Sequence, residues 1–388
     1  MARVQIAINH EKCPTPINCH RCIEVCPQCV YKMHLVKIEK GKEMPEDAWE
    51  LAMWFPDQCA GCLECIRVCP EGALTLIAPC ERECPAHVDI PSMISLIKAN
   101  MEEEALALHR NRNPFVETCA RACPHLCDVT CERKRIDGKP VNVRSLKRYM
   151  AEVAKNSSAK PLMKENPKNA DKKVAVIGAG PSGLSCAYFL RRIGYPVTVF
   201  DKADKPGGII TSMIPLYRLP EEAVKRDIDF ILSTGIELKL NCEVGKDISL
   251  NELRKEGYKA FYIAIGAQSP TPLGIEGEDL DGVIQAWDLL KDFRKGIEPK
   301  LGKKVSVIGG GNAAIDAART AFRFGSDVTI IYRRDREEMP AIQDEIEEAE
   351  KEGIKFLFLA RPLKIVGESG KVKKLICGKM EIKGYDLN

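Results

Sequence analysis

Long apolar segments are missing from this sequence. Residues 1–10 hold no apolar stretch that could serve as a signal peptide, and no run of about 18 apolar residues without glycine, proline or charge occurs anywhere. We therefore expect neither an export signal nor a membrane span. A strong net charge is missing too, because 58 Lys and Arg stand against 55 Asp and Glu for a net charge of +3. Charge alone therefore implies no polyanionic partner.

Catalytic side-chain sets are also lacking. Neither a Ser–His–Asp arrangement nor a pair of carboxylates stands out, so we name no catalytic residue. Apolar residues make up 45% and charged residues 29%, a globular balance that excludes a disordered chain. A length of 388 residues suggests two to three domains.

Cysteine, in contrast, is abundant, with 18 residues of which fifteen fall between positions 13 and 131. Dense cysteine without an export signal indicates metal binding in a reducing compartment, here the cytoplasm, and argues against disulfides. Cys186, Cys242 and Cys377 follow. We interpret Cys186 and Cys377 as small core residues. Since no Cys-x-x-Cys occurs after residue 65, we expect no redox-active disulfide.

Residues 1–78 carry a pair of motifs typical of ferredoxins. The spacing Cys-x2-Cys-x2-Cys-x3-Cys-Pro begins at Cys59, and the same pattern with a longer first gap begins at Cys13. In such two-cluster proteins the fourth cysteine of each motif ligates the other cluster. A pair of structural zinc sites is the alternative, and Cys29 is a spare thiol. We predict two [4Fe–4S] clusters, one held by Cys13, Cys19, Cys22 and Cys69 and the other by Cys26, Cys59, Cys62 and Cys65.

Residues 79–153 hold six more cysteines among helical patterns such as residues 90–98, where Pro91 suits a first helical turn. Cysteines four residues apart lie on one face of a helix, one turn apart. The six are enough for one further [4Fe–4S] cluster, and a second would need ligands other than cysteine. A zinc site or a structural role is the alternative. The candidate ligands are Cys80, Cys84, Cys119, Cys123, Cys127 and Cys131.

The composition changes again at residues 154–170, which are polar and interrupted by proline, as in a linker. The wider stretch 131–173 holds thirteen Lys or Arg and five Asp or Glu, which indicates a solvated segment or, alternatively, docking on an acidic partner.

After the linker, a strand, glycine turn, helix and strand occur twice, once from Val174 and again from Val305. This duplication predicts an α/β fold with two Rossmann-like nucleotide-binding units on parallel sheets, at 171–300 and 301–388. A helical iron–sulfur domain and a ferredoxin-like α+β domain would precede them.

The first unit carries Gly-x-Gly-x-x-Gly at Gly178, Gly180 and Gly183, between a predicted strand at 173–177 and a predicted helix at 184–193. Such glycines allow a tight turn and bring a pyrophosphate close to the helix N-terminus. The next strand, at 197–200, ends in Asp201, which suits the ribose hydroxyls of a dinucleotide. A glycine-rich structural turn without a ligand is the alternative.

The second unit carries Gly309, Gly311 and Ala314 at the same spacing. Its next strand, at 328–332, is followed by Arg333 and Arg334 where the first unit has an acid. Guanidinium groups can pair with the 2′-phosphate of NADP, which an acid would repel, so we predict NADP(H) rather than NAD(H). Alternatively, both arginines belong to a solvated face beside the acidic helix predicted at 344–352.

Together these residues give the sequence a resemblance to a known family. Residues 79–388 resemble the small (beta) subunit of glutamate synthase and its NAD(P)H-oxidoreductase relatives, and residues 1–78 resemble a two-cluster ferredoxin fused in front. The matching segments are Cys80 to Pro85, Asn113 to Pro124, Val176 to Leu184, Lys205 to Gly208, Tyr217 to Pro220, Ala264 to Ala267, Tyr332 to Arg334 and Met339 to Ala341.

The resemblance implies FAD on the first unit, NADP(H) on the second and iron–sulfur clusters in the helical domain. The sequence departs from the family at 212–215, which reads Ser-Met-Ile-Pro where relatives often have Tyr-Gly-Ile-Pro. Lys147 stands where relatives can use Gln or Glu as a cluster ligand. Nothing resembles the amidotransferase or the large synthase subunit. The resemblance adds these cofactor-binding candidates: Pro181, Ser182, Gly207, Gly208, Arg218, Gly266, Ala267 and Asn312.

We interpret the chain as an electron-transfer flavoprotein subunit that connects NAD(P)H, FAD and three, or alternatively four, [4Fe–4S] clusters with a larger redox enzyme or a ferredoxin. The alternative is a non-catalytic wiring and assembly subunit with degenerate nucleotide sites. In the first unit a strand returns at 261–266, and its equivalent in the second unit would fall beyond residue 388. We therefore expect an incomplete second unit and another chain that completes the FAD domain, unless the sequence is a fragment.

Overall fold

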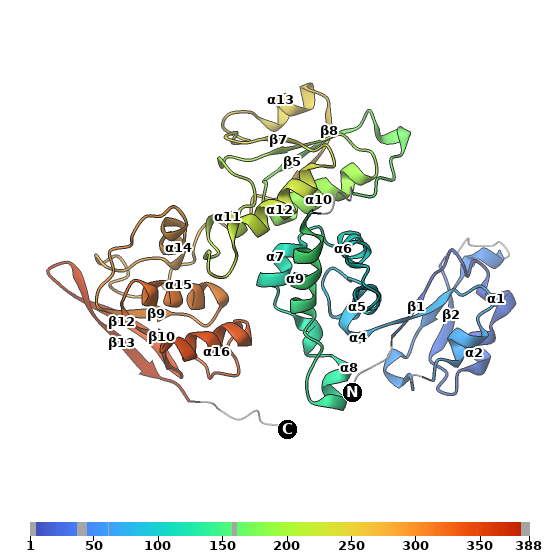
Figure 1. The fold of residues 1–388 in the computed structure, drawn as a ribbon, viewed down its shortest axis with the longest axis horizontal. Coiled ribbons are helices and arrows are strands. Elements are labelled where there is room, and N and C mark those ends of the chain that lie inside the picture. The colour runs from blue at the N-terminus through green and yellow to red at the C-terminus, as the bar shows by residue number, and fades with distance from the viewer. Residues whose placement is uncertain (1–4, 37–44, 61, 157–160, 382–388) are drawn as a thin grey trace. The chain divides into compact units, whose positions relative to one another are not determined.

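The computed structural model describes residues 5–36, 45–60, 62–156 and 161–381. Figure 1 shows the chain coloured by residue number, and contacts between residues divide it into two compact units. The first unit comprises residues 1–116 and 125–159, and the second comprises residues 117–124 and 160–388. Among the described residues, no helix is long and apolar enough to cross a membrane.

The first cysteine-rich segment folds around two antiparallel strand pairs. β1 (Gln5–Ile8) pairs with β4 (Leu74–Ile77), and β2 (Tyr31–Leu35) pairs with β3 (Trp49–Met53). β1 and β4 coincide with two short apolar runs of the sequence, at 4–8 and 74–77. Between them lie α1 (Pro16–Cys19), α2 (Arg21–Val25), α3 (Glu64–Val68), η1 (Glu46–Ala48) and η2 (Pro56–Gln58). The buried core consists of Ile6, Val30, Tyr31, Leu51, Cys65 and Leu74.

The rest of the first unit is helical. The helix predicted at 90–98 is confirmed as α5 (Ile90–Lys98), and its start follows from local chemistry. Pro91 lies in the first turn, where it removes no helical hydrogen bond, and the Asp89 side chain accepts a hydrogen bond from the backbone N–H of Ser92 (3.0 Å). The other helices are α4 (Pro79–Arg82), α6 (Glu102–Arg110), η3 (Leu126–Asp128), α8 (Glu132–Asp137), α9 (Val143–Val153) and η4 (Ala154–Asn156).

The second unit contains two parallel sheets. The first sheet has the order β7 (Glu237–Lys239), β6 (Val197–Phe200), β5 (Lys173–Ile177), β8 (Tyr258–Ile263). β6 is buried along its whole length, as expected for a strand covered on both faces. The predicted helix at 184–193 begins three residues earlier, as α10 (Pro181–Arg192), because Pro181 directly after Gly180 is a favourable first helical residue. The other helices of the second unit before residue 256 are η5 (Pro167–Asn169), α11 (Ile209–Ser212), α12 (Glu221–Leu232) and α13 (Leu250–Lys255), and the unit also includes residues 117–122 of α7 (Val116–Ala122).

The second sheet repeats the same pattern on a smaller scale. Its order is β11 (Lys355–Leu357), β10 (Asp327–Ile331), β9 (Lys304–Ile308), and all its pairings are parallel. Within the described residues, β9 has no neighbour on the side where β5 pairs with β8. The remaining elements are α14 (Ala286–Arg294), α15 (Asn312–Arg323), α16 (Gln343–Glu352) and the hairpin of β12 (Ala360–Glu368) and β13 (Lys371–Lys379).

Much of the predicted linker at 154–170 is folded. Ala154 is buried in the helical core of the first unit. In the second unit, the backbone N–H of Lys164 donates to the carbonyl of Arg192 (2.7 Å), and the Asn169 amide donates to the carbonyl of Ile193 (2.9 Å). The middle of the predicted linker, 157–160, lies outside the described residues.

Candidate iron–sulfur and nucleotide-binding sites

Two small cavities in the ferredoxin-like part are lined by cysteines. One is lined by Cys26, Cys59, Cys62 and Cys65 together with apolar side chains such as Ile6 and Val30. The other is lined by Cys13, Cys19, Cys22 and Cys69, with Leu51 and Leu74 beside them. Each cavity therefore gathers one of the two ligand sets that the sequence predicts, with the fourth cysteine contributed by the other motif.

The two motifs also share a backbone conformation. His20 follows Cys19 and Leu63 follows Cys62, and both residues have a positive φ, of 39° and 61°. Each begins the short helix that carries the next cysteine, α2 or α3. A left-handed conformation costs a residue with a side chain roughly 1–2 kcal/mol, so its presence at equivalent positions indicates that both loops are shaped for the same purpose.

The chemistry of these cavities suits a cluster of iron and sulfide. Burial and the neighbouring thiol of Cys13 raise the pKa of Cys22 to about 12, and burial likewise raises the pKa of Cys13 itself. Thiolates therefore form there only when a positive centre compensates their charge. Two sulfurs already accept hydrogen bonds, Cys65 from the Tyr31 hydroxyl (3.1 Å) and Cys69 from the backbone N–H of Ala73 (3.2 Å).

The number of cysteines at each cavity suits a cluster. A tetrahedral zinc ion draws its ligands to one point, whereas a cubane binds each thiolate at a different iron. Each cavity is lined by four cysteines, the number that one [4Fe–4S] cluster takes.

The six cysteines of the helical region divide between the two units. Cys80 and Cys84 lie at α4, Cys127 lies in η3, and Cys131 directly precedes α8, all in the first unit. Burial raises the pKa of Cys80, and the neighbouring Cys131 raises it further. Cys119 lies on α7, Cys123 directly follows the last residue of this helix, and residues 117–124 belong to the second unit.

The first glycine turn is shaped by close backbone approach. Gly178 has a φ of +112°, and a Cβ atom there would lie 2.2 Å from the carbonyl oxygen of Ala264. A Cβ at Gly183 would lie 1.9 Å from the carbonyl oxygen of Gly178. At Gly180, in contrast, nothing lies within 4 Å of such an atom. The turn is therefore packed tightly on its protein side and open where a pyrophosphate would approach the N-terminus of α10.

Two neighbouring segments support this turn. The Gly207 N–H donates to the carbonyl of Ala179 (2.7 Å), and a Cβ at Gly208 would lie 3.0 Å from the Cα of Gly180. Asp201 accepts hydrogen bonds from the backbone N–H groups of Ala179 (2.6 Å) and Ala203 (2.8 Å). Its carboxylate therefore closes the turn from the end of β6.

The remaining candidates of the first nucleotide-binding part lie on α10 and after β8. The Ser182 hydroxyl is 3.0 Å from the hydroxyl of Tyr262 on β8. Gly266 and Ala267 lie in the loop after β8, where Ala264 and Ile265 precede them, and Gly266 has a φ of +70°. The start of this loop reaches the turn, because the carbonyl oxygen of Ala264 is the atom nearest to a Cβ built at Gly178.

The second glycine turn is braced by a different set of contacts. The Asn312 side chain accepts a hydrogen bond from the backbone N–H of Ile342 (2.9 Å), and Ala341 N–H donates to the carbonyl of Gly310 (3.1 Å). Nothing lies within 4 Å of a Cβ built at Gly311, and Ala314 is buried beneath the turn. This turn too is open at the N-terminus of the helix that follows, α15.

Arg333 and Arg334 are exposed just after β10, which ends at Ile331, one residue before the predicted end of the strand. Arg334 lies 3.6 Å from the Glu338 carboxylate, and both side chains of this pair are about half exposed, at 50% and 49%. Such a pair contributes little stability and is easily exchanged for a stronger anion. Arg336, in contrast, makes two hydrogen bonds to Glu350 (2.9 and 3.0 Å).

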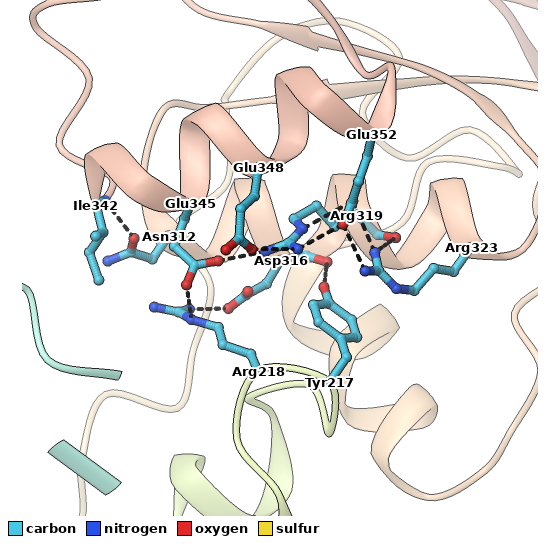
Figure 2. Close-up of polar contacts among 10 residues, drawn as sticks. All are labelled: Tyr217, Arg218, Asn312, Asp316, Arg319, Arg323, Ile342, Glu345, Glu348 and Glu352. Atoms are coloured by element: carbon cyan, nitrogen blue, oxygen red, sulfur yellow. Dashed lines mark hydrogen bonds and ion pairs between the residues drawn. The ribbon is translucent and has the colours of Figure 1, made fainter. Parts of the chain in front are cut away.

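Arg218 lies in a buried network rather than on an open surface (Figure 2). From the loop before α12, its guanidinium reaches Asp316 on α15 (2.7 Å) and Glu345 on α16 (3.1 Å). Only 6% of the Arg218 side chain is exposed. Glu345 also accepts from Arg319 (2.6 Å). The resemblance implies a cofactor contact for Arg218, and the structure shows it engaged between the two nucleotide-binding parts of the second unit.

Tyr217 strengthens the same connection. Its hydroxyl donates to the carbonyl of Asp316 (3.3 Å), and the Arg323 guanidinium lies 3.8 Å from the centre of its ring (Figure 2). Burial raises the pKa of Asp316 to about 6, against the lowering effect of Arg218. Sequence reasoning missed Asp316, Arg319 and Glu345. The sequence signal that could have identified them is a charged residue on the core-facing side of an alanine-rich or amphipathic helix.

Comparison with known proteins separates an iron–sulfur part of the chain from a nucleotide-binding part. Residues 172–387, with an overlapping match at 140–243, match the pyridine nucleotide-disulphide oxidoreductase family. The chain belongs to this family. Residues 12–74 match a 4Fe-4S dicluster domain, and residues 50–159 match dihydropyrimidine dehydrogenase domain II, 4Fe-4S cluster. The predicted cofactor classes, iron–sulfur clusters with FAD and a nicotinamide dinucleotide, are thereby confirmed.

Several curated proteins are similar to the larger part of the chain. It is 42% identical over 312 residues to NADPH-Fe(3+) oxidoreductase subunit beta of Geobacter sulfurreducens, covering 79% of this chain and 46% of that protein. It is 38% identical over 329 residues to NADP(+)-dependent formate dehydrogenase subunit beta of Moorella thermoacetica, with the same coverage of 79% and 46%. The chain thus spans about half the length of these relatives.

The resemblance to glutamate synthase is also confirmed. The chain is 38% identical over 308 residues to the glutamate synthase [NADPH] small chain of Escherichia coli, covering 76% of this chain and 65% of that protein. The shared part includes the nucleotide-binding region, so the likeness concerns the oxidoreductase fold rather than any one substrate.

Proposed function

We propose that this chain is the electron-transfer subunit of a larger oxidoreductase, moving electrons between NADPH, FAD and a series of [4Fe–4S] clusters. The observation that carries the proposal is the presence in one chain of two cysteine-lined cavities and two open glycine turns. The names of the relatives agree with it, because each includes NADPH or NADP(+), and they describe a beta subunit or a small chain.

The nucleotide-binding residues would bind FAD and NADPH and fix their orientation. Gly178 to Gly183 with Gly207 and Gly208 would hold the pyrophosphate of FAD, and Asp201 keeps that turn in shape. Arg333 and Arg334 would pair with the 2′-phosphate of NADPH. When bound, FAD exchanges a hydride with the nicotinamide and single electrons with iron–sulfur clusters, so no side chain of the protein has to act as acid or base.

The cysteines hold the clusters and set their surroundings. The eight ferredoxin-type cysteines would ligate two clusters, and at least one more would use four of the six cysteines at 80–131. Because burial opposes deprotonation of thiols such as Cys22 and Cys80, cluster binding displaces protons and couples to folding. The hydrogen bonds that Cys65 and Cys69 accept would stabilise negative charge on the cluster that each thiolate would hold.

The edge of the first sheet indicates a further segment. Among the described residues, β8 is the last strand on its side, and apolar side chains on it and just after it are exposed, namely Ile263 (63%) and Ile265 (59%). Proteins rarely leave such an edge uncovered. We infer that a segment outside the described residues, from a partner chain or from the rest of a longer protein, covers this edge and the flavin side of the unit.

The test is anaerobic purification of the protein with its bound cofactors. We expect iron, sulfide and FAD together, with NADPH-dependent reduction of a one-electron dye. Iron and sulfide without flavin, and without dye reduction after addition of FAD, would instead support a wiring and assembly subunit with degenerate nucleotide sites.

A further inference from the structure

The N-terminus of α7 is capped by a residue far away in the sequence. The two carboxylate oxygens of Asp227 accept hydrogen bonds from the backbone N–H groups of Glu117 (3.1 Å) and Thr118 (2.8 Å). Phe115, just before α7, has no side-chain acceptor that could cap the helix locally. A carboxylate at this place satisfies free N–H groups and complements the helix dipole.

A second set of contacts reinforces this cap. The Glu117 carboxylate is buried and accepts hydrogen bonds from Arg226 (2.6 Å) and Arg121 (2.7 Å). Arg226 and Asp227 are neighbours on α12, so one helix supplies both a cation and an anion to the first turn of α7. Asp227 itself is fully buried. We call the contacts of Asp227, Glu117 and Arg226 the α7–α12 joint. Burying these charges costs free energy unless each is paired, so the joint requires a fixed geometry.

The joint links the cysteine-bearing segment at α7 to the part of the second unit that contains the first glycine turn. α7 carries Cys119, which directly follows the capped Thr118, and Cys123 directly follows the last residue of α7. α12 packs on α10, where the rings of Phe230 and Tyr188 are 6.0 Å apart, and α10 starts at the first glycine turn. A continuous path of packed helices therefore leads from the two cysteines to the proposed flavin site.

We propose that Asp227, with Glu117 and Arg226, is a positioning device that fastens the cysteine-bearing helix α7 to the flavin-binding part of the second unit. The proposal rests on the proposed function, and it takes Cys119 and Cys123 to be two of the four cysteines that would ligate the helical-region cluster. Electron tunnelling slows exponentially with distance, so a helix that moves as one body with the glycine turn keeps this distance constant.

The test compares Asp227→Asn with Asp229→Asn. Asp229 is a matched control on the same helix, because its exposed carboxylate forms a surface ion pair with Lys225. An amide offers one acceptor oxygen where the carboxylate offers two, so one N–H of α7 loses its partner. In hydrogen–deuterium exchange of the anaerobic full chain, we expect peptides covering 116–124 to exchange roughly tenfold faster in Asp227→Asn and at the wild-type rate in Asp229→Asn. Unchanged exchange in Asp227→Asn would overturn the proposal.

A milder variant covers the case in which Asp227→Asn does not fold. Arg226→Gln removes only the partly exposed arm of the joint, and we expect faster exchange in the same peptides, with Lys225→Gln as its control. We also expect slower reduction of the helical-region cluster by NADPH, followed by its electron paramagnetic resonance signal, while reduction of FAD keeps its rate. Equal rates in Arg226→Gln and the wild type for both readouts would contradict the proposal.

Variants of the two cysteines distinguish a failure of the proposed function from a failure of the positioning role. If Cys119→Ser and Cys123→Ser both retain the full iron content, the cluster-ligand role on which the proposal depends is wrong. If they lose iron while Asp227→Asn leaves α7 protected, the proposed function stands and the positioning role of Asp227 is wrong.

Discussion

The hydroxyl of Tyr31 donates a hydrogen bond to the sulfur of Cys65, with 3.1 Å between the two atoms. Tyr31 lies at the start of β2 and Cys65 lies in α3, and both are buried in the core of the ferredoxin-like part. A hydrogen bond to a ligating sulfur stabilises the more negative, reduced state of a cluster.

Replacing Tyr31 by Phe should therefore lower the reduction potential of this cluster. A hydrogen bond of about 1 kcal/mol corresponds to on the order of 40 mV for a one-electron couple. Redox titration followed by electron paramagnetic resonance measures the shift. Tyr149→Phe, at an exposed tyrosine bonded to Glu102, is the matched control and should leave the potential unchanged. Equal potentials for wild type and Tyr31→Phe would contradict the assignment of Cys65 as a ligand.

Iron content tests the number of clusters. Three clusters predict about 12 iron atoms per chain after anaerobic purification. Cys65→Ser should lose about a third of them, whereas Cys29→Ser, at an exposed thiol outside both motifs, should retain all of them. A value near eight for the wild type would remove the helical-region cluster, and a value near sixteen would establish a fourth.

Nucleotide preference tests Arg333 and Arg334. Changing both to Gln should weaken NADPH binding roughly 10- to 100-fold, the range that corresponds to a charge-assisted hydrogen bond, and leave NADH binding nearly unchanged. Arg336→Gln, whose guanidinium is already bound by Glu350, serves as the control. Measured affinities that fall equally for both nucleotides would show that the two arginines do not recognise the 2′-phosphate.

The buried network around Arg218 predicts a large effect on stability. Arg218→Gln leaves Asp316 and part of Glu345 without their cation, which should cost roughly 3–5 kcal/mol. Calorimetry should show a fall in Tm of roughly 6–20 °C for the second unit. Glu348→Gln, at a carboxylate that is 56% exposed, should change Tm little. Loss of FAD at an unchanged Tm would support the direct cofactor contact that the resemblance implies for Arg218.

Acid should destabilise the helical part of the first unit through His109. Burial, followed by the charge of Lys147, lowers the pKa of this imidazole to about 3. The unfolded chain takes up a proton near the ordinary pKa of about 6.5, whereas the folded chain does not, so stability is lost as pH falls below that value. Each pH unit between about 6 and 4 should remove roughly 1.2–1.4 kcal/mol.

Denaturant unfolding at several pH values, followed by circular dichroism, measures this dependence. His109→Gln should lack this part of the slope, and His87→Gln, at an exposed histidine of the same unit, should keep it. Parallel slopes for wild type and His109→Gln would show that the imidazole is accessible to protons in the folded state.

Local spacing determined a large part of this protein. The cysteine spacings predict which thiols meet, and each cavity collects the expected four, because a short loop between two ligands leaves few ways to place them. The glycine spacing predicts two strand–turn–helix units, which β5 with α10 and β9 with α15 confirm. Helix starts such as that of α5 also follow from the sequence, because Pro91 and Asp89 act within one turn.

The tertiary structure decided what depends on helices that are distant in the sequence. No spacing indicates that Asp227 caps α7, a contact across about 110 residues, or that Arg218 pairs with Asp316, 98 residues away. The tertiary structure also brings the Asp201 carboxylate to the backbone N–H of Ala179 in the first glycine turn. A buried charge needs a partner, but the sequence shows only that the charge exists. Which partner it finds depends on the angle and register at which whole helices pack, and these are set by the complete core rather than by neighbouring residues.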